Sequence, residues 1–256
     1  CKNVTYDNVH LFSRVVGNND GLDIVDCWNV VVSNSFFDCG DDCICPKSDS
    51  FMGVKNLVVT NCIIKSESNG IKCGTGSIGS FTDITISNCV IYDSRFAGIA
   101  LEIVDGGTME RIAVNNITMH NVNGGIFVKI GQREGEKPGT IKNISFTNII
   151  ADGIGAWRPN TQTYYHKPSE GTKIGMSIVG QPGYCVENVT LSHIYMQFAG
   201  GGTLEDVARV MEDKPKVYPE YSNFGITSAY AFNVRHVKGI QFNNVTSGSQ
   251  YSFCFA

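Results

Sequence analysis

The sequence predicts an all-β protein that folds as one right-handed, single-stranded parallel β-helix, a solenoid whose coils repeat at about 26 to 28 positions along the chain. The first observation is a repeat of nearly constant period: similar short segments begin at Asn3, Asn29, Asn56, Asp83 and Arg111. The second is that each segment is a short β-branched strand with alternating apolar positions and no helical periodicity. A period of 20–50 residues indicates a solenoid, and units made of strands alone favour a parallel β-helix.

The repeat continues towards the C-terminus at longer and increasing intervals, in segments that begin at Asn143, Asn188 and Gly239. Longer intervals indicate insertions between coils, at about Asp152–Tyr184 and Phe198–Thr227. Insertions in a solenoid gather on one face, often the binding face. Their aromatic residues, Trp157 and Tyr221 among them, suit stacking on sugars, although the rings can equally pack the long loops down. The only helix that the sequence predicts is a short one within residues 200–216.

An asparagine follows the strand in most repeats. Because these asparagines fall at equivalent positions, we expect them to stack as a ladder inside the solenoid: Asn34, Asn61, Asn88, Asn116 and Asn148. The residues that follow them should form the next stacked layer: Ser35, Cys62, Cys89, Ile117 and Ile149.

The composition is that of an ordinary globular protein, with 42% hydrophobic and 17% charged residues. No linker or low-complexity tract divides the chain, so we expect one domain over residues 1–256. The net charge of -4 offers no basic surface to nucleic acid. No apolar run reaches the roughly 18 residues of a membrane span, and no signal peptide is visible. Residue 1 falls inside an expected strand, so we expect further N-terminal coils or a cap, and a secreted or periplasmic location.

The chain has 10 cysteines. Cys39, Cys43 and Cys45 lie close together, but their spacing fits zinc poorly and no histidine accompanies them, so we expect no metal site. Disulfides, for instance around Cys43, stay open. Cys62 and Cys89 lie one repeat apart in matching contexts and are expected to stack in the core.

The segment from Gly17 to Ser48 carries two acidic motifs. Asp20 lies in N-N-D-G, and Asp41 and Asp42 follow in G-D-D, almost one repeat later. Either motif alone is typical of a turn. One coil apart, however, they would bring three carboxylates together. Mutual repulsion should then raise at least one pKa, which would place a proton donor beside ionised bases, as glycoside hydrolysis requires.

A parallel β-helix with N-x-D-G followed by G-D-D resembles glycoside hydrolase family 28, the polygalacturonases and their rhamnogalacturonan-degrading relatives. The later segments GIALEIVDGG, GGGTLEDVARV and YPEYSNFG look most like bacterial members that act from a chain end. The resemblance implies an inverting hydrolase in which Asp41 protonates the leaving oxygen and Asp20 and Asp42 activate water. Asn18, in the first motif, is a further candidate for substrate binding.

The chain departs from the family pattern of G-D-D, G-H-G and R-I-K. In one alignment the G-H-G coil is deleted, Lys72 takes the place of the motif arginine and Gly74 that of its lysine. In the other, NGIKCGTGSIGS matches the G-H-G coil without a histidine, and R-I-K falls on Ala100-Leu101-Glu102. Both alignments weaken the site for a substrate carboxylate. Lys72 is the first candidate for the surviving cation, and Lys129 and Arg133 are further ones, with a solvated surface charge as the alternative for each.

The leading hypothesis is therefore a glycoside hydrolase that releases terminal galacturonate or rhamnose from a pectic polymer. We expect a monomer that needs no cofactor or metal, with the polysaccharide as its partner. One alternative is a non-catalytic polysaccharide-binding β-helix of the adhesin or tail-spike kind. The other is a pectate lyase, which would hold Ca²⁺ with such acids and use an arginine as base; among arginines only Arg14 is near the acids in sequence.

Overall fold

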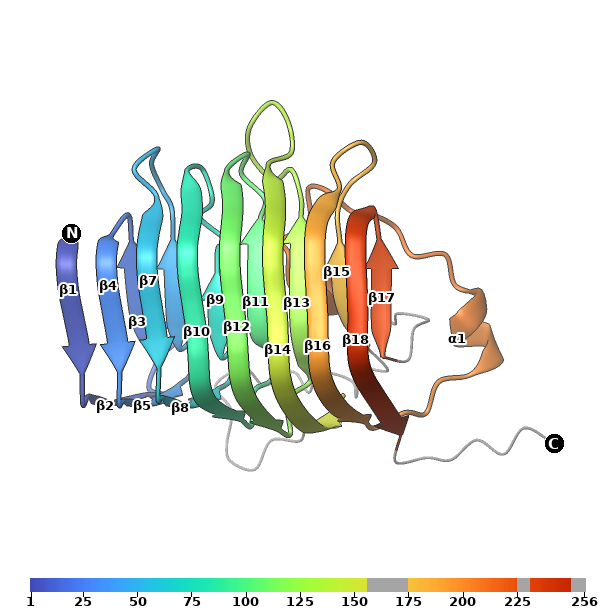
Figure 1. The fold of residues 1–256 in the computed structure, drawn as a ribbon, viewed down its shortest axis with the longest axis horizontal. Coiled ribbons are helices and arrows are strands. Elements are labelled where there is room, and N and C mark those ends of the chain that lie inside the picture. Colours follow the sequence, from blue (N-terminus) through green and yellow to red (C-terminus); the bar gives the residue numbers. More distant parts are fainter. Residues whose placement is uncertain (156–174, 225–230, 250–256) are drawn as a thin grey trace.

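The computed structural model describes residues 1–155, 175–224 and 231–249. They form a right-handed parallel β-helix, as predicted, and the strands of both of its sheets pair in parallel (Figure 1). The core lies between the sheets, where apolar side chains from successive coils stack. Among the described residues, no helix has the length and apolar character to cross a membrane.

The larger sheet takes one strand from each coil: β1 (Lys2–Asp7), β4 (Trp28–Ser33), β7 (Val54–Thr60), β10 (Ser80–Tyr92), β12 (Thr108–His120), β14 (Thr140–Ile154), β16 (Val186–Phe198) and β18 (Val237–Ser249). In the first coils a short second strand continues it: β2 (His10–Ser13), β5 (Phe36–Cys39) and β8 (Ile63–Ser66). The smaller sheet holds β3 (Leu22–Val25), β6 (Ile44–Lys47), β9 (Ile71–Cys73), β11 (Ala97–Ile103), β13 (Gly124–Ile130), β15 (Met176–Val179) and β17 (Phe232–Arg235).

The strand register confirms the repeat. Val4 pairs with Val30, Val30 with Leu57 and Leu57 with Ile84, so these coils advance in the same steps as the repeated segments of the sequence. The later partners of Ile84 continue the predicted series of intervals to the last coil: Ile112, Ile144, Val189 and Ile240.

The asparagine ladder forms, but on the outside of the solenoid, so the prediction of an internal ladder was wrong. Asn61 Nδ2 donates to Asn34 Oδ1 at 3.2 Å, and Asn116 Nδ2 donates to Asn88 Oδ1 at 3.1 Å, yet these hydrogen bonds lie on the exposed surface. These residues adopt left-handed backbone, with φ of 49–54°. Asparagine tolerates this conformation better than most residues, which suits it to the corner of each coil. The next layer is buried as predicted: Ser35, Cys62, Cys89, Ile117 and Ile149.

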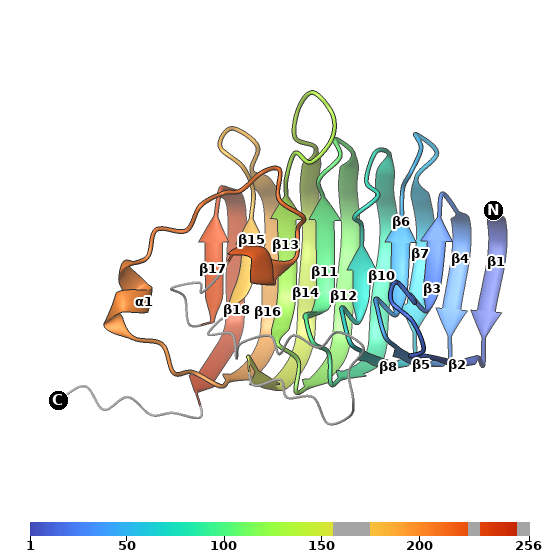
Figure 2. The same ribbon diagram turned by 180° about the vertical axis from the view of Figure 1, so that it is seen from behind.

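The second insertion contains α1 (Leu204–Ala208), within the range expected for a helix, and the 3₁₀ turn η1 (Tyr221–Phe224). After α1, residues 211–224 return across the outer face of the smaller sheet and end with η1 (Figure 2). This segment is here called the strap. Gln132 N donates to Pro215 O at 2.7 Å, and Phe224 packs against Phe127 of β13. The strap therefore runs back along the solenoid towards the coils that carry the acidic motifs.

Candidate active site

The two acidic motifs lie side by side on neighbouring coils. Gly21 N donates to Asp42 O at 2.8 Å, and the strands that follow pair with Leu22 opposite Ile44. Asp20 therefore lies next to the Asp41-Asp42 pair, as the spacing predicted.

Both motif glycines are required by close packing. A Cβ on Gly21 would lie 2.4 Å from Cys43 O, and a Cβ on Gly40 would lie 2.5 Å from Asn19 Oδ1. Such contacts are far below normal separations: a side chain at Gly21 would push against the backbone of the next coil, and one at Gly40 would displace the Asn19 amide, which donates to Ser13 O. The motifs thus hold the acids on coils that pack in direct contact.

Asp20 holds a proton more readily than an ordinary carboxyl group. Burial raises its pKa, and the charges of Asp42 and Asp41 raise it further, while the hydrogen bond and charge of Lys47 lower it; the result is a pKa of about 6. Lys47 Nζ lies 2.9 Å from Asp20 Oδ2 and 2.7 Å from Asp23 Oδ1. The expected rise of one pKa in the cluster is found here.

The pKa of Asp42 is shifted in the opposite direction from that of Asp20. It is buried, but its Oδ1 accepts hydrogen bonds from Ser68 Oγ at 2.7 Å, Asn69 N at 3.0 Å and Asn69 Nδ2 at 2.9 Å. Burial raises the pKa of Asp42, but the charge of Lys72 and these hydrogen bonds outweigh it, so the pKa falls below its usual value. Asp42 is therefore ionised at neutral pH.

Asp41 lies beside both of them and is half-buried. Its Oδ1 accepts a hydrogen bond from the Asp42 backbone N at 3.0 Å, and its carbonyl accepts one from Ser66 Oγ at 2.8 Å. These two contacts fix the backbone and side chain of Asp41 while Asp42 turns inward. The neighbouring acids thus occupy different environments.

Lys72, the first candidate for the surviving cation, lies beside the acids. Its Nζ lies 3.3 Å from Asp42 Oδ2 and 2.8 Å from Glu220 Oε1 of the strap. The side chain is only 2% exposed. Burial alone would lower the pKa of Lys72, but the charges of Glu220, Glu102 and Asp42 raise it well above its usual value.

Comparison with known proteins decides the family. Residues 1–174 match the family model described as "Glycosyl hydrolases family 28". This chain belongs to that family.

The family's curated members include relatives at modest identity. A polygalacturonase of Brassica napus is 25% identical over 78% of this chain and 48% of its own length. Exopolygalacturonase B of Aspergillus niger is 26% identical over 75% of this chain and 44% of its own length. The chain thus spans less than half the length of these two relatives.

Two solved family structures share the fold. A hyperthermoactive exopolygalacturonase from Thermotoga maritima has a TM-score of 0.63 at 21% identity, over 77% of this chain and 43% of its own. A family 28 exopolygalacturonase of Yersinia enterocolitica has a TM-score of 0.55 at 14% identity, over 91% of this chain and 37% of its own.

Within this family 28 chain, the coils that follow G-D-D are stacked without a gap. Ile44 of the G-D-D coil pairs with Ile71, and Lys72 pairs with Ala100 on the coil after that. The triplet Ser68-Asn69-Gly70 thus lies on the coil directly after G-D-D, where the second alignment sets the G-H-G motif. Asn69 makes two of the hydrogen bonds that hold Asp42. In the same alignment Glu102 takes the place of the last residue of R-I-K.

The other candidate cations are engaged elsewhere. Lys129 is covered by the strap: its Nζ donates to Asp213 O at 2.8 Å and lies 4.7 Å from the centre of the Phe224 ring, and burial lowers its pKa to about 8. Arg133 binds both oxygens of Asp105, at 3.0 and 2.9 Å. The structure thus brings neither residue to the three acids.

Three predicted substrate-binding residues remain: Asn18, Trp157 and Tyr221. Asn18 is exposed with a left-handed φ of 53°, so it forms the turn that leads into Asp20. Trp157 lies outside the described residues. Tyr221 lies in η1, at the strap end next to Glu220, and its side chain is outside what the structure describes.

Sequence reasoning missed Glu220, which lies 148 residues beyond Lys72 in the chain. It is 8% exposed, and its two carboxylate oxygens lie 3.1 and 3.3 Å from Asn69 Nδ2. The YPEYSNFG segment that carries it resembles the family but does not mark Glu220 as a site residue. No spacing rule links it to the acids, because it belongs to an insertion rather than to a coil.

A second charged cluster flanks the acids. Arg14 forms ion pairs with Asp38 and with Glu67, the latter at 2.5 Å between Nη1 and Oε1. Because Asp38 and Glu67 come from successive coils, Arg14 joins three coils in one network. The arginine that the lyase alternative requires as a base is therefore held in ion pairs.

Neither a disulfide nor a metal cluster of cysteines forms among the described residues, whose nine cysteines are all free. Cys43, for which the sequence leaves a disulfide open, is a free thiol: its Sγ donates to Lys65 O at 2.9 Å. Asp20, Asp23 and Cys45 have ligand atoms within 4.8 Å of one another. The ammonium of Lys47 pairs with the carboxylates of Asp20 and Asp23, so it already supplies a positive charge at this position.

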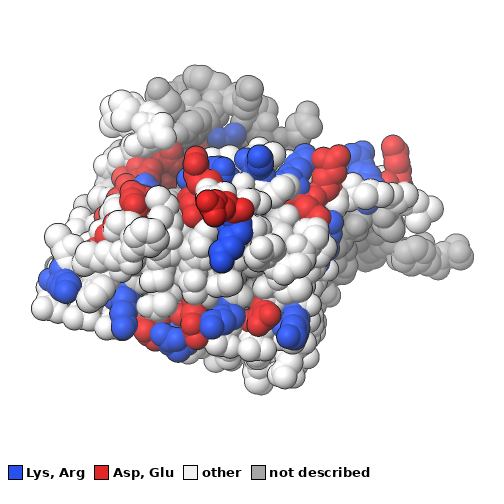
Figure 3. Space-filling model, turned by 90° about the horizontal axis from the view of Figure 1, so that it is seen from above, with Lys and Arg blue, Asp and Glu red and all other residues white. Residues whose placement is uncertain are grey.

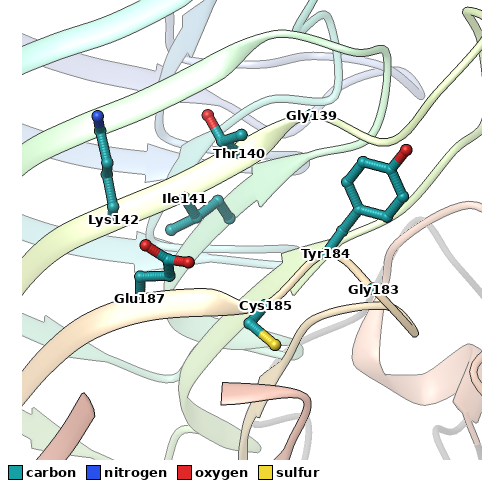
Figure 4. Close-up of a pocket in the computed structure, with 8 residues that line it drawn as sticks. All are labelled: Gly139, Thr140, Ile141, Lys142, Gly183, Tyr184, Cys185 and Glu187. Carbon is teal, nitrogen blue, oxygen red and sulfur yellow. The ribbon is translucent and has the colours of Figure 1, made fainter. Parts of the chain in front are cut away.

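A pocket in the described part of the chain lies away from the acids. It has a volume of about 270 Å³ and is lined at the starts of β14 and β16 by residues such as Lys142, Tyr184 and Glu187 (Figure 4). These strands belong to later coils than the acids, and no predicted site residue lines the pocket. The face of the molecule seen in Figure 3 carries interleaved acidic and basic side chains, which favours no ligand of one charge.

Proposed function

We propose that this chain hydrolyses glycosidic bonds of a pectic polysaccharide with inversion of configuration, using Asp41 as general acid and Asp20 with Asp42 to activate water. The observation that carries the reaction class is the contrast within the cluster: the pKa of Asp20 is raised to about 6 while that of Asp42 is lowered; the acid role of Asp41 follows the family resemblance of the G-D-D motif. Environments that push the pKa values of neighbouring carboxylates apart are typical of acid–base pairs. Family membership supports the same reaction class.

In the proposed reaction the bond from the anomeric carbon to the leaving oxygen breaks as Asp41 gives its proton to that oxygen. A water molecule attacks the opposite face of the sugar and forms the new carbon–oxygen bond. Asp42 and ionised Asp20 take the proton that this water loses. Inversion requires acid and base roughly 6.5–9.5 Å apart, which leaves room for the water.

We further propose that the enzyme acts from a chain end. The strap covers the outer face of the smaller sheet next to Asp42, where Glu220 contacts Lys72 and Asn69. A polymer that passed the acids on this side would meet the strap. A polysaccharide substrate is met outside the cell, so a secreted or periplasmic location goes with this proposal.

The test is product analysis by NMR and chromatography on oligogalacturonides and rhamnogalacturonan oligosaccharides, with and without a chelator. We expect single terminal sugars to appear first, with inverted anomeric configuration, and no effect of the chelator. Unsaturated products that require Ca²⁺ would indicate a lyase. Binding without turnover, unchanged in Asp41→Asn, would indicate a polysaccharide-binding module and would overturn the proposal.

A further inference from the structure

The cation beside the acids is already paired with two carboxylates of the protein. Lys72 Nζ contacts Glu220 Oε1 at 2.8 Å, Asp42 Oδ2 at 3.3 Å and Tyr218 Oη at 3.2 Å. It also lies 4.9 Å from the centre of the Tyr218 ring. The ammonium donates hydrogen bonds to Glu220 and Tyr218, and its single positive charge already faces the two carboxylates of Glu220 and Asp42. Lys72 therefore offers no unpaired charge to a carboxylate of the substrate.

The strap holds Glu220 firmly in this position. Glu220 accepts from Asn69 Nδ2 as well as from Lys72, and Tyr218 Oη also contacts Thr75 Oγ1 at 3.1 Å. Further along the strap, Asp213 pairs with Arg235 at 2.5 Å and its carbonyl accepts from Lys129. A substrate carboxylate that displaced Glu220 would leave a buried carboxylate without its cation, which is costly.

The other cations close to the cluster are paired as well. Lys47 pairs with Asp20 and Asp23, and Arg14 with Asp38 and Glu67. Lys65, opposite Asp38 on the next coil, pairs with Asp93, and the backbone N of Arg95 donates to Ser66 O beside Glu67. Together with Lys72 these are five cations, against the eight carboxylates of Asp20, Asp23, Asp38, Asp41, Asp42, Glu67, Asp93 and Glu220. The surroundings of the acids are therefore net negative and repel an anionic sugar.

We propose that Glu220 is a specificity-determining residue. Its carboxylate binds Lys72 and Asn69 at the place that a substrate carboxylate would need. The subsite beside Asp42 therefore takes a neutral hexose or deoxyhexose rather than a uronate. Carboxylate oxygens of Asp42 and Glu220 accept hydrogen bonds from sugar hydroxyl groups, which a neutral sugar supplies. This inference rests on the proposed function and narrows its substrate class.

The test compares 4-nitrophenyl α-galactoside with 4-nitrophenyl α-galacturonide, which differ only in a hydroxymethyl group against a carboxylate, and includes 4-nitrophenyl α-rhamnoside as the deoxyhexose. For the wild-type chain we expect kcat/KM on the better neutral glycoside to exceed that on the uronide by at least about tenfold, since a site with buried groups of the wrong charge discriminates strongly. A preference for the uronide would overturn the proposal without any variant.

The Glu220→Gln variant tests the assignment to this residue. It keeps the shape of the side chain and a hydrogen bond acceptor for Asn69, but frees one interaction of Lys72. We expect the ratio of neutral to uronide kcat/KM to fall by about tenfold or more, mainly through KM on the uronide. The matched control is Glu136→Gln, an exposed acid in the turn between β13 and β14, which should leave the ratio unchanged. An unchanged ratio in a folded Glu220→Gln variant would refute the role of Glu220.

A binding measurement separates this proposal from the proposed function. The Asp41→Asn variant is titrated with the same three glycosides and binding is followed by saturation-transfer NMR. Tighter binding of the neutral sugars supports the charge selectivity of the subsite even if no glycoside is turned over, in which case only the proposed reaction fails. Tighter binding of the uronide overturns the selectivity even if the enzyme is active.

Discussion

The carboxylate of Glu220 lies 2.8 Å from the ammonium of Lys72, although 148 residues separate the two in the chain. Lys72 belongs to a coil of the solenoid, whereas Glu220 belongs to the strap that returns over it. The ion pair is buried and connects directly to Asp42 through Lys72. The strap is therefore a structural part of the acidic site, and a change in either residue alters the charge that Asp42 experiences.

Replacing Asp41 by Asn should abolish general acid catalysis and keep the shape of the site. General acids typically contribute about 10²–10⁴-fold, so we expect kcat to fall at least that far on a natural oligosaccharide. On an aryl glycoside, whose leaving group needs little protonation, the loss should be much smaller. Steady-state kinetics on the two substrates gives the comparison.

The variants Asp20→Asn and Asp42→Asn are the matched controls, because both substrates need the activated water. Each should lose similar activity on the two substrates. If Asp41→Asn instead showed equal losses on both, and Asp20→Asn showed the difference, the acid role would move to Asp20.

The pH profile should report the raised pKa of Asp20. If Asp20 must be ionised to activate water, kcat/KM falls as the pH drops through about 6, the pKa of this group. Lys47 lowers that pKa, so Lys47→Met should move the acid limb to higher pH. Lys137→Met, at an exposed position, should leave the limb in place. A limb that moved to lower pH in Lys47→Met, or did not move, would contradict the role of Lys47.

Glu102 should make the stability of the fold depend on pH. It is fully buried, neither of its oxygens has a hydrogen bond partner among the described residues, and burial raises its pKa well above the usual value. Glu102 has an ordinary, lower pKa in the unfolded state. Between the two pKa values the folded state keeps a proton on Glu102 that the unfolded state has released. The free energy of unfolding should therefore fall as pH rises from about 5 to about 8. The limiting slope for one such proton is about 1.4 kcal/mol per pH unit.

Glu102→Gln removes this titration. Chemical denaturation at pH 5 and pH 8 should show a smaller pH-dependent loss in Glu102→Gln than in the wild-type chain. The exposed control Glu136→Gln should behave as wild type. Equal losses in all three chains would mean that Glu102 is ionised in the folded state.

The external ladder should contribute to stability through both backbone and side chain. Asn61 has a φ of 54° and donates to Asn34. Asn61→Ala loses the hydrogen bond and forces alanine into the left-handed region, which together cost about 2 kcal/mol. Asn61→Gly loses only the hydrogen bond, because glycine accepts this conformation, and should be about 1 kcal/mol more stable than Asn61→Ala. Equal midpoints of urea unfolding for the two variants would contradict the backbone contribution.

The sequence by itself determined the solenoid and the meeting of the acids. Each coil repeats a local strand-and-turn pattern, and stacking such coils allows one register, in which apolar positions meet in the core. The spacing between Asp20 and Asp41 then places these acids on neighbouring coils, and the backbone bond from Gly21 to Asp42 follows from that register. Local repetition carries this information, so it is readable from the chain alone.

Only the tertiary structure decided whether the asparagines lie inside or outside the solenoid and which segment covers Lys72. A periodic asparagine fits an inner or an outer ladder equally well in sequence, and only the folded chain shows that the ladder hydrogen bonds lie on the exposed surface. The strap is an insertion without a repeat, so its path depends on long-range contacts such as Phe224 with Phe127 and Glu220 with Lys72. Because those contacts join segments unrelated by the coil period, the charge environment of the site is a property of the folded molecule.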